Sequence, residues 1–207
     1  MPPSRLETNC GRAYPDRMAD EAAKPGIEGV IAAAKQAPGR GLPPVHLWNP
    51  AHCGEIDIVI RKDGVWFHEG TPIGREALVR LFSTVLRKDS DGIHLVTPVE
   101  KLKITVEDAP FIATRVERAG GALRFRTNVG DEVEAGPENA IRVEMGEDGE
   151  PRPYLHVRRG LEALIARPVF YELVEMAEER QTPDGPTLGV ASNGAWFPVG
   201  PAHAHQV

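Results

Sequence analysis

Four residues have the side chains of an anion-binding site: Thr71, Arg75, Glu100 and Lys101. Arg75 directly follows the run GTPIG at residues 70–74 and stands where a helix is predicted to begin. A cation there opposes the helix dipole, whereas the unpaired N–H groups of the first helical turn favour an anion. Thr71 adds a hydroxyl, Lys101 adds a second cation, and Glu100 has the charge to orient one of the cations.

We therefore predict that these four side chains face one cleft between two domains, where ligand sites often lie. Two alternatives stay open. The GTPIG run is more simply explained as a tight connector, and the stretch around Glu100 and Lys101 is equally compatible with a solvated linker.

Other chemistry has weaker support in the sequence. His46, His52 and Cys53 have the side chains of metal ligands, but no second Cys-His cluster follows to complete a closed zinc site. Ser83 and Ser192 lack the Gly-x-Ser-x-Gly setting of a catalytic serine, and no glycine-rich phosphate loop occurs. We therefore predict no metal, no cofactor and no catalytic residue. An enzyme is the least favoured option, since its catalytic groups would have to assemble from distant positions.

The elements that would position the predicted site are a β-hairpin and a helix. Isoleucines alternate with other residues over 56–60, Asp63-Gly64 favours a tight turn, and residues 65–68 form the returning strand. Arg75 opens a helix with an apolar stripe at helical spacing. A short helix is also predicted near residues 27–34, ended by Pro38-Gly39.

The rest of the chain reads as short strands, one helix and a last hairpin. Strands separated by Gly-containing turns follow Pro98. A helix is predicted from Leu161 to Ala177, with Pro168 inside it as a kink. The final hairpin turns at Ser192-Asn193-Gly194.

Two turn signals recur in the same order in the two halves. Asp63-Gly64 is followed by Gly74 and the segment REALV, and Asp148-Gly149 by Gly160 and the segment LEALI, at nearly the same spacing. This order predicts a duplicated unit of hairpin, helix and strand. The predicted class is α+β, with a disordered tail over 1–18, an N-terminal domain over 19–100 that includes the leading helix, and a β-rich C-terminal domain over 101–207.

The chain resembles a bacterial family known as domain of unknown function 1285. The resemblance runs from Ile27 to about Pro198 and is densest at DGVW (63–66), TPI (71–73), Arg75 and LVTPVE (95–100). It implies a two-domain fold with internal duplication, whose second domain is loosely similar to pleckstrin-homology folds. It also implies a role in ligand binding and signalling, and it brings no catalytic residues.

Composition limits the partners. Thirty acidic and 24 basic residues give a net charge of −6, which does not favour a nucleic-acid partner. The first residues lack the apolar core of a signal peptide, so we expect none, and the sequence has no apolar run of the roughly 20 residues that a membrane span needs. We therefore expect a cytoplasmic, non-catalytic binding module for a small anionic, nucleotide-like ligand, used in signalling or stress response. The alternative is a protein-interaction scaffold.

Overall fold

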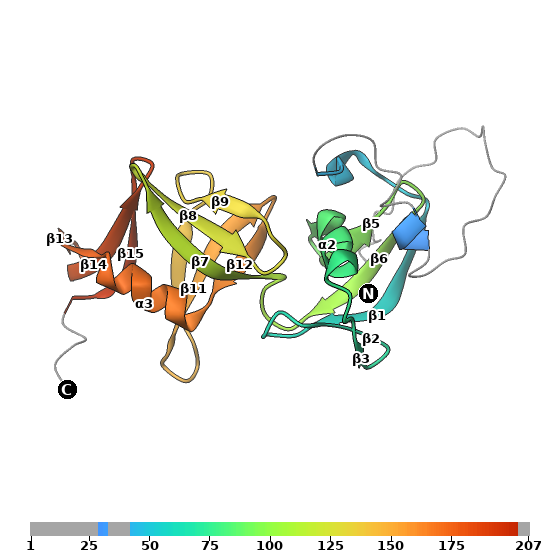
Figure 1. Cartoon of the computed structure of the whole chain (residues 1–207), viewed down its shortest axis with the longest axis horizontal. Helices are drawn as coiled ribbons and strands as arrows, with labels where there is room; N and C mark the ends of the chain where they lie inside the picture. Colours follow the sequence, from blue (N-terminus) through green and yellow to red (C-terminus); the bar gives the residue numbers. More distant parts are fainter. Residues whose placement is uncertain (1–28, 33–41, 203–207) are drawn as a thin grey trace, which may run out of the picture. The chain divides into compact units, whose positions relative to one another are not determined.

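The computed structural model describes residues 29–32 and 42–202, which form two compact units (Figure 1). The N-terminal unit includes residues 66–105 and the described residues up to Val59. The C-terminal unit contains residues 106–202 together with the turn segment 60–65. The predicted domain boundary after residue 100 lies inside strand β6 (Glu100–Val106), shortly before this division. The predicted tail over 1–18 lies outside the described residues, and of the predicted leading helix residues 29–32 are described and are helical.

The N-terminal unit is a six-stranded sheet with one α-helix and a short 3₁₀-helix. Its elements are η1 (Val45–Leu47), β1 (His52–Ile60), β2 (Trp66–His68), β3 (Thr71–Pro72), α2 (Glu76–Thr84), β4 (Leu86–Asp89), β5 (Gly92–Val96) and β6. The strand order is β3-β2-β1-β6-β5-β4, so that two three-stranded meanders join along β1 and β6. Gly64 has a φ of 81°, as the predicted Asp63-Gly64 turn requires.

One face of this sheet forms the core with α2. Leu86, Leu95 and Leu102 are cross-strand partners on β4, β5 and β6, and all three are buried. Phe82 of α2 lies against Trp66 of β2 with ring centroids 6.3 Å apart. The opposite face of β4–β6 carries charged residues and His94 at most of the alternating positions, together with the buried Val96.

The C-terminal unit contains a six-stranded sheet and a three-stranded sheet. Its elements are β7 (Phe111–Ala119), β8 (Ala122–Thr127), β9 (Glu132–Glu134), β10 (Ile141–Met145), β11 (Pro151–Arg158), β12 (Leu161–Ile165), α3 (Arg167–Glu175), β13 (Glu178–Thr182), β14 (Gly185–Ser192) and β15 (Ala195–Pro201). The larger sheet has the order β10-β11-β12-β7-β8-β9, with β12 and β7 parallel, and the smaller has the order β13-β14-β15. The predicted turn at Asn193-Gly194 is confirmed, with φ angles of 47° and 77°.

The predicted helix from Leu161 to Ala177 is wrong in its first part. Leu161–Ile165 is strand β12, in which alternate residues are buried, and it pairs with strands on both sides. Helix α3 begins only at Arg167, which places Pro168 in the first turn, where a missing N–H breaks no helical hydrogen bond. Pro168 therefore starts the helix instead of kinking it.

The duplication is present, but its elements match differently from the predicted alignment. The order of three strands, one helix and three strands occurs as β1-β2-β3-α2-β4-β5-β6 and again as β10-β11-β12-α3-β13-β14-β15. Each copy builds two meanders, and β10 contacts β15 as β1 neighbours β6. The LEALI segment thus corresponds to strand β3 and not to helix α2. The meander β7-β8-β9 stands outside the repeat.

No helix in the described ranges combines the length and the apolar character needed to cross a membrane.

Candidate functional site

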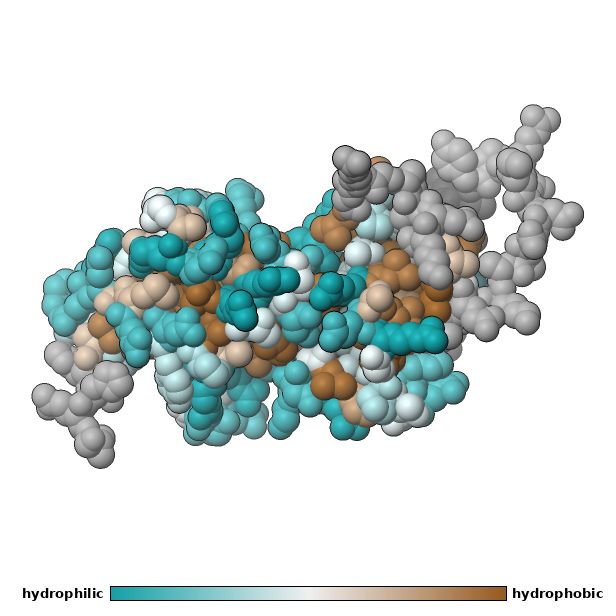
Figure 2. All heavy atoms as spheres, viewed as in Figure 1, coloured by the Kyte–Doolittle hydropathy of each residue, from teal (hydrophilic) through white to brown (hydrophobic). Residues whose placement is uncertain are grey.

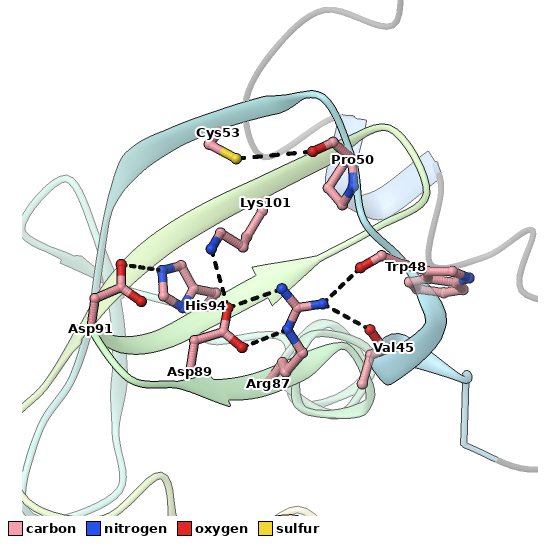
Figure 3. A network of polar contacts seen from close by, with 9 residues as sticks. All are labelled: Val45, Trp48, Pro50, Cys53, Arg87, Asp89, Asp91, His94 and Lys101. Carbon is pink, nitrogen blue, oxygen red and sulfur yellow. Dashed lines mark hydrogen bonds and ion pairs between the residues drawn. The ribbon is translucent and has the colours of Figure 1, made fainter. Parts of the chain in front are cut away.

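A network of charged side chains lies on the polar face of β4–β6 (Figure 3). Arg87 holds Asp89 through two contacts, Nε to Oδ1 at 2.8 Å and Nη2 to Oδ2 at 2.9 Å. Lys101 Nζ donates to the same Asp89 Oδ2 at 3.1 Å. The second terminal nitrogen of Arg87 donates to the carbonyls of Val45 and Trp48 at 3.1 and 2.7 Å. Arg87 therefore ties the segment around η1 to strand β4.

His94 lies beside this network and is 2% exposed. Its Nε2 is 3.4 Å from Asp91 Oδ2 and its Nδ1 is 3.8 Å from Asp89 Oδ2. Nδ1 has no hydrogen-bond partner in the described part of the chain. Burial lowers the pKa of His94, although Asp91 acts in the opposite direction. Burial acts to raise the pKa of Asp89, but the hydrogen bonds from Arg87 and Lys101 outweigh it, and the pKa lies below its ordinary value.

Asp89, Asp91 and His94 bring three potential metal ligands within 4.8 Å of one another. A divalent cation there would compete with Arg87 and Lys101, which already neutralise Asp89. The two carboxylates are balanced by two cations, so an added ion would leave excess positive charge in a half-buried site. The arrangement fits a structural ion-pair network better than a metal centre.

The four residues of the predicted site have different surroundings. Thr71 is exposed on the two-residue strand β3, and Arg75 is the exposed N-cap of α2. Glu100 and Lys101 are neighbours on β6, where Glu100 is buried and Lys101 bonds Asp89. No hydrogen bond or ion pair links Thr71 or Arg75 to each other or to the pair on β6 within the described residues. The shared cleft stays a prediction.

A pocket of about 410 Å³ lies in the C-terminal unit, on strands β7, β8 and β9 and helix α3. The visible face of this unit is largely hydrophilic (Figure 2). The pocket is lined by Arg115, Val116, Glu117, Arg124, Phe125, Arg126, Glu132 and Glu172. Three arginines and three glutamates thus share one concave surface.

The strand register arranges these charges in two rows. Arg115 of β7 is the cross-strand partner of Arg126 of β8, which is in turn the partner of Glu132 of β9. In the next row Arg124 pairs with Glu117 at 3.5 Å and Glu134 at 2.9 Å. The hydrogen bond that Arg124 donates to Glu134 is the main cause that raises the pKa of Arg124. The one arginine of the second row is therefore paired with two glutamates, and the row has an excess of negative charge.

The arginines of the first row are not paired in this way. Like charges directly opposite on neighbouring strands are destabilising. Yet the side chains of Arg115 and Arg126 form no salt bridge or hydrogen bond with any described residue, and both are exposed. Two adjacent guanidinium groups with free donors are suited to a carboxylate or a phosphate.

Sequence reasoning missed this pair although a signal was present. The strand LRFRT places Arg124 and Arg126 two residues apart and therefore on one face. Their relation to Arg115 could not be read from the chain, because it depends on the β7–β8 register and on the irregularity between Ala113 and Arg115.

The comparisons with known proteins agree with the two-unit architecture. No curated protein matches the chain. It is similar to the crystal structure of a DUF1285 family protein from Silicibacter pomeroyi DSS-3, with 48% identity and a TM-score of 0.75 over 84% of this chain and 95% of the other. A DUF1285 family protein from Shewanella baltica OS155 is 28% identical over 57% of this chain and 90% of the other, with a TM-score of 0.47.

The family models divide the chain into two domains, as the two compact units do. The N-terminal domain of DUF1285 matches residues 43–109, and the C-terminal domain matches residues 110–199. These two matches together span most of the chain, which therefore belongs to the DUF1285 family, a family of unknown function.

Proposed function

We propose that the chain is a non-catalytic binding module for a small anionic ligand, and that the ligand binds in the pocket that contains Arg115 and Arg126. The observation that carries the proposal is the cross-strand pair of Arg115 and Arg126, two like charges whose side chains form no salt bridge or hydrogen bond among the described residues. A bound carboxylate or phosphate would relieve their repulsion and accept several charge-assisted hydrogen bonds. Arginine cannot give up its proton in a protein, so these two cations are suited to holding a ligand and not to proton transfer.

We favour this pocket over the site predicted from the sequence because Arg115 and Arg126 bind no carboxylate of the described residues, whereas Lys101 of the predicted site does. Lys101 is already bound to Asp89, which is itself held by Arg87. An anion at Lys101 would first have to displace a carboxylate. Arg115 and Arg126 have no such competitor within hydrogen-bonding distance in the described structure.

The family resemblance adds a cellular location, a process and a fold likeness to the proposal. We place the protein in the cytoplasm, in signalling or stress response, with a C-terminal unit loosely similar to pleckstrin-homology folds. Antiparallel meanders with a single helix, α3, support that likeness. The alternative, a protein-interaction scaffold, would need an exposed sheet edge with apolar neighbours. The edge strand β13 instead carries Glu178, Glu179 and Arg180, charges that discourage edge pairing.

Isothermal titration with inorganic phosphate and with small carboxylates tests the proposal. The double variant Arg115→Gln/Arg126→Gln should lose binding, and its melting temperature should be unchanged or slightly raised because the like-charge pair is gone. Arg118→Gln is the matched control, since Arg118 is exposed on the same strand but does not line the pocket. It should bind as the wild type does.

Three outcomes contradict the proposal. The wild type binds no anion; the double variant binds with wild-type affinity; or Arg75→Ala removes binding while the double variant retains it. The last outcome returns the site to the residues around Thr71 and Arg75.

A further inference from the structure

We infer that the ligand of the Arg115–Arg126 pocket is a zwitterion, a small molecule with a carboxylate and an ammonium group such as an amino acid. This inference rests on the proposed function, because it takes the arginine pair as the place where the anionic group binds. It adds a second group to the ligand, on the evidence of the acidic residues in the same pocket.

The first observation is the position of Glu132. It lies directly opposite Arg126 on the neighbouring strand β9 and lines the pocket. Neighbouring strands are about 4.8 Å apart, so the sequence of charges across three strands is positive, positive, negative over roughly 10 Å. The backbone therefore sets an acidic group one strand away from the arginine pair.

The second observation is Glu172, which reaches the same pocket from helix α3. Helix α3 contacts β7, the strand of Arg115, so acidic side chains enter the pocket from the elements on both sides of the arginine pair. Neither Glu132 nor Glu172 forms a salt bridge with a described residue. By contrast, Glu117 of this pocket is 3.5 Å from Arg124.

These two glutamates are unfavourable for a plain anion and favourable for a zwitterion. A carboxylate beside an anion weakens binding by like-charge repulsion, whereas a carboxylate beside an ammonium strengthens it. A pocket selective for simple anions would be better built without them. Two arginines and two glutamates that form no salt bridges with described residues match the two charges of an amino acid.

The inference predicts that Glu132→Gln changes the affinity for simple anions and for amino acids in opposite directions. Glu132→Gln should strengthen the binding of acetate and inorganic phosphate, because it removes a repelling charge. The same substitution should weaken the binding of glycine, β-alanine or γ-aminobutyrate by about tenfold for the member that fits best, the loss expected for one charge-assisted contact. Glu172→Gln should act in the same directions.

The experiment is titration calorimetry of the full chain with three matched probes: β-alanine, propionate, which lacks the amine, and propylamine, which lacks the carboxylate. The other two amino acids extend the zwitterion series. Wild type, Glu132→Gln, Glu172→Gln and the control Glu147→Gln are compared. Glu147 is exposed in the β10–β11 turn and lies outside the pocket, so its variant should bind like the wild type. Melting temperatures confirm that each variant is folded.

The results separate this inference from the proposed function. Zwitterions should bind more tightly than propionate, with the advantage lost in Glu132→Gln or Glu172→Gln. If propionate binds as tightly as β-alanine and Glu132→Gln improves both, the zwitterion inference is overturned while the anion site stands. If none of the carboxylate or phosphate probes binds the wild type, the proposed function itself fails.

Discussion

Arg87 and Asp89, two residues apart on strand β4, are joined by two parallel contacts of 2.8 and 2.9 Å on the polar face of the N-terminal sheet. Their side chains are 15% and 23% exposed, so neither charge is fully hydrated. The same guanidinium also donates to the carbonyls of Val45 and Trp48. The Arg87 side chain therefore forms an ion pair and also holds the segment around η1, which is distant in the sequence.

Removal of this guanidinium should destabilise the N-terminal unit. Arg87→Ala leaves Asp89 with Lys101 alone and deprives two backbone carbonyls of their donor, so we expect a loss of about 2–4 kcal/mol. Arg80→Ala is the control, because Arg80 is exposed on α2 and lies 3.9 Å from Glu76. It should change stability by no more than about 0.5 kcal/mol. Urea unfolding measures both, and equal losses would show that the Arg87 contacts contribute nothing.

The pKa of His94 should make stability depend on pH. Burial lowers the pKa of His94 in the folded chain below the value of about 6.5 expected in the unfolded chain. The unfolded state then binds more protons as the pH falls below about 7, so the stabilisation is complete above that pH and is lost as the pH falls toward the folded pKa. Unfolding free energies between pH 7 and pH 5 should decrease, and His94→Gln should flatten this slope. An unchanged slope in the variant would assign the effect to another group.

Gly189 should be intolerant of a side chain. A Cβ at this position would contact the ring of Trp196 and lie 2.7 Å from the carbonyl oxygen of Phe197. Arg180 also lies over this ring, with its guanidinium 5.4 Å from the ring centroid, so a displaced ring would lose that contact as well. We expect Gly189→Ala to lower the free energy of unfolding by roughly 1–3 kcal/mol.

Gly200 is the matched control for this substitution. It lies on β15 opposite Leu188, and a Cβ there meets no atom within 4 Å. Gly200→Ala should be neutral or stabilising by about 0.4–1 kcal/mol, because it restricts the unfolded chain. Thermal melts of both variants suffice, and equal melting temperatures would show that the hairpin adjusts around Trp196.

The arginine at position 75 should make helix α2 less stable than a capping residue would. It is the N-cap of α2, has extended backbone angles and forms no capping hydrogen bond with its side chain. Arg75→Asp supplies a capping oxygen and a charge of the right sign, so stability should rise by about 1 kcal/mol. Arg80→Asp makes the same charge change within the helix and should not stabilise. A loss of stability in Arg75→Asp would mean that Arg75 has a partner worth more than the cap.

Local turn chemistry made parts of the fold predictable. Asp63-Gly64 and Asn193-Gly194 turn where expected, because the glycines adopt positive φ and Asn193 tolerates it. The α2 region was also predictable from its apolar spacing. These features depend on a few adjacent residues, which a single sequence displays directly.

Strand β12 was mispredicted as helix because its conformation depends on pairing with strands distant in the sequence. Leu161–Ile165 has good helix-forming residues, but strands β11 and β7 flank it and bury alternate side chains. The same limitation hid the candidate site. Arg115 and Arg126 become neighbours only through the register of two strands, and the partner of Lys101 proved to be Asp89, which lies on a strand that the sequence did not reveal.

The meander β7-β8-β9 bears on how the sequence of the protein can evolve. Both copies of the repeat complete their two meanders without it, and its strand pairing with the second copy is made by β12. Its outward-facing charges therefore lie on an addition to the repeated framework. Under the proposed function, substitutions at Arg115, Arg126 or Glu132 would alter which molecule is recognised while the repeated framework stays intact. A lineage with such a binding site would then exchange ligands without having to evolve a new fold.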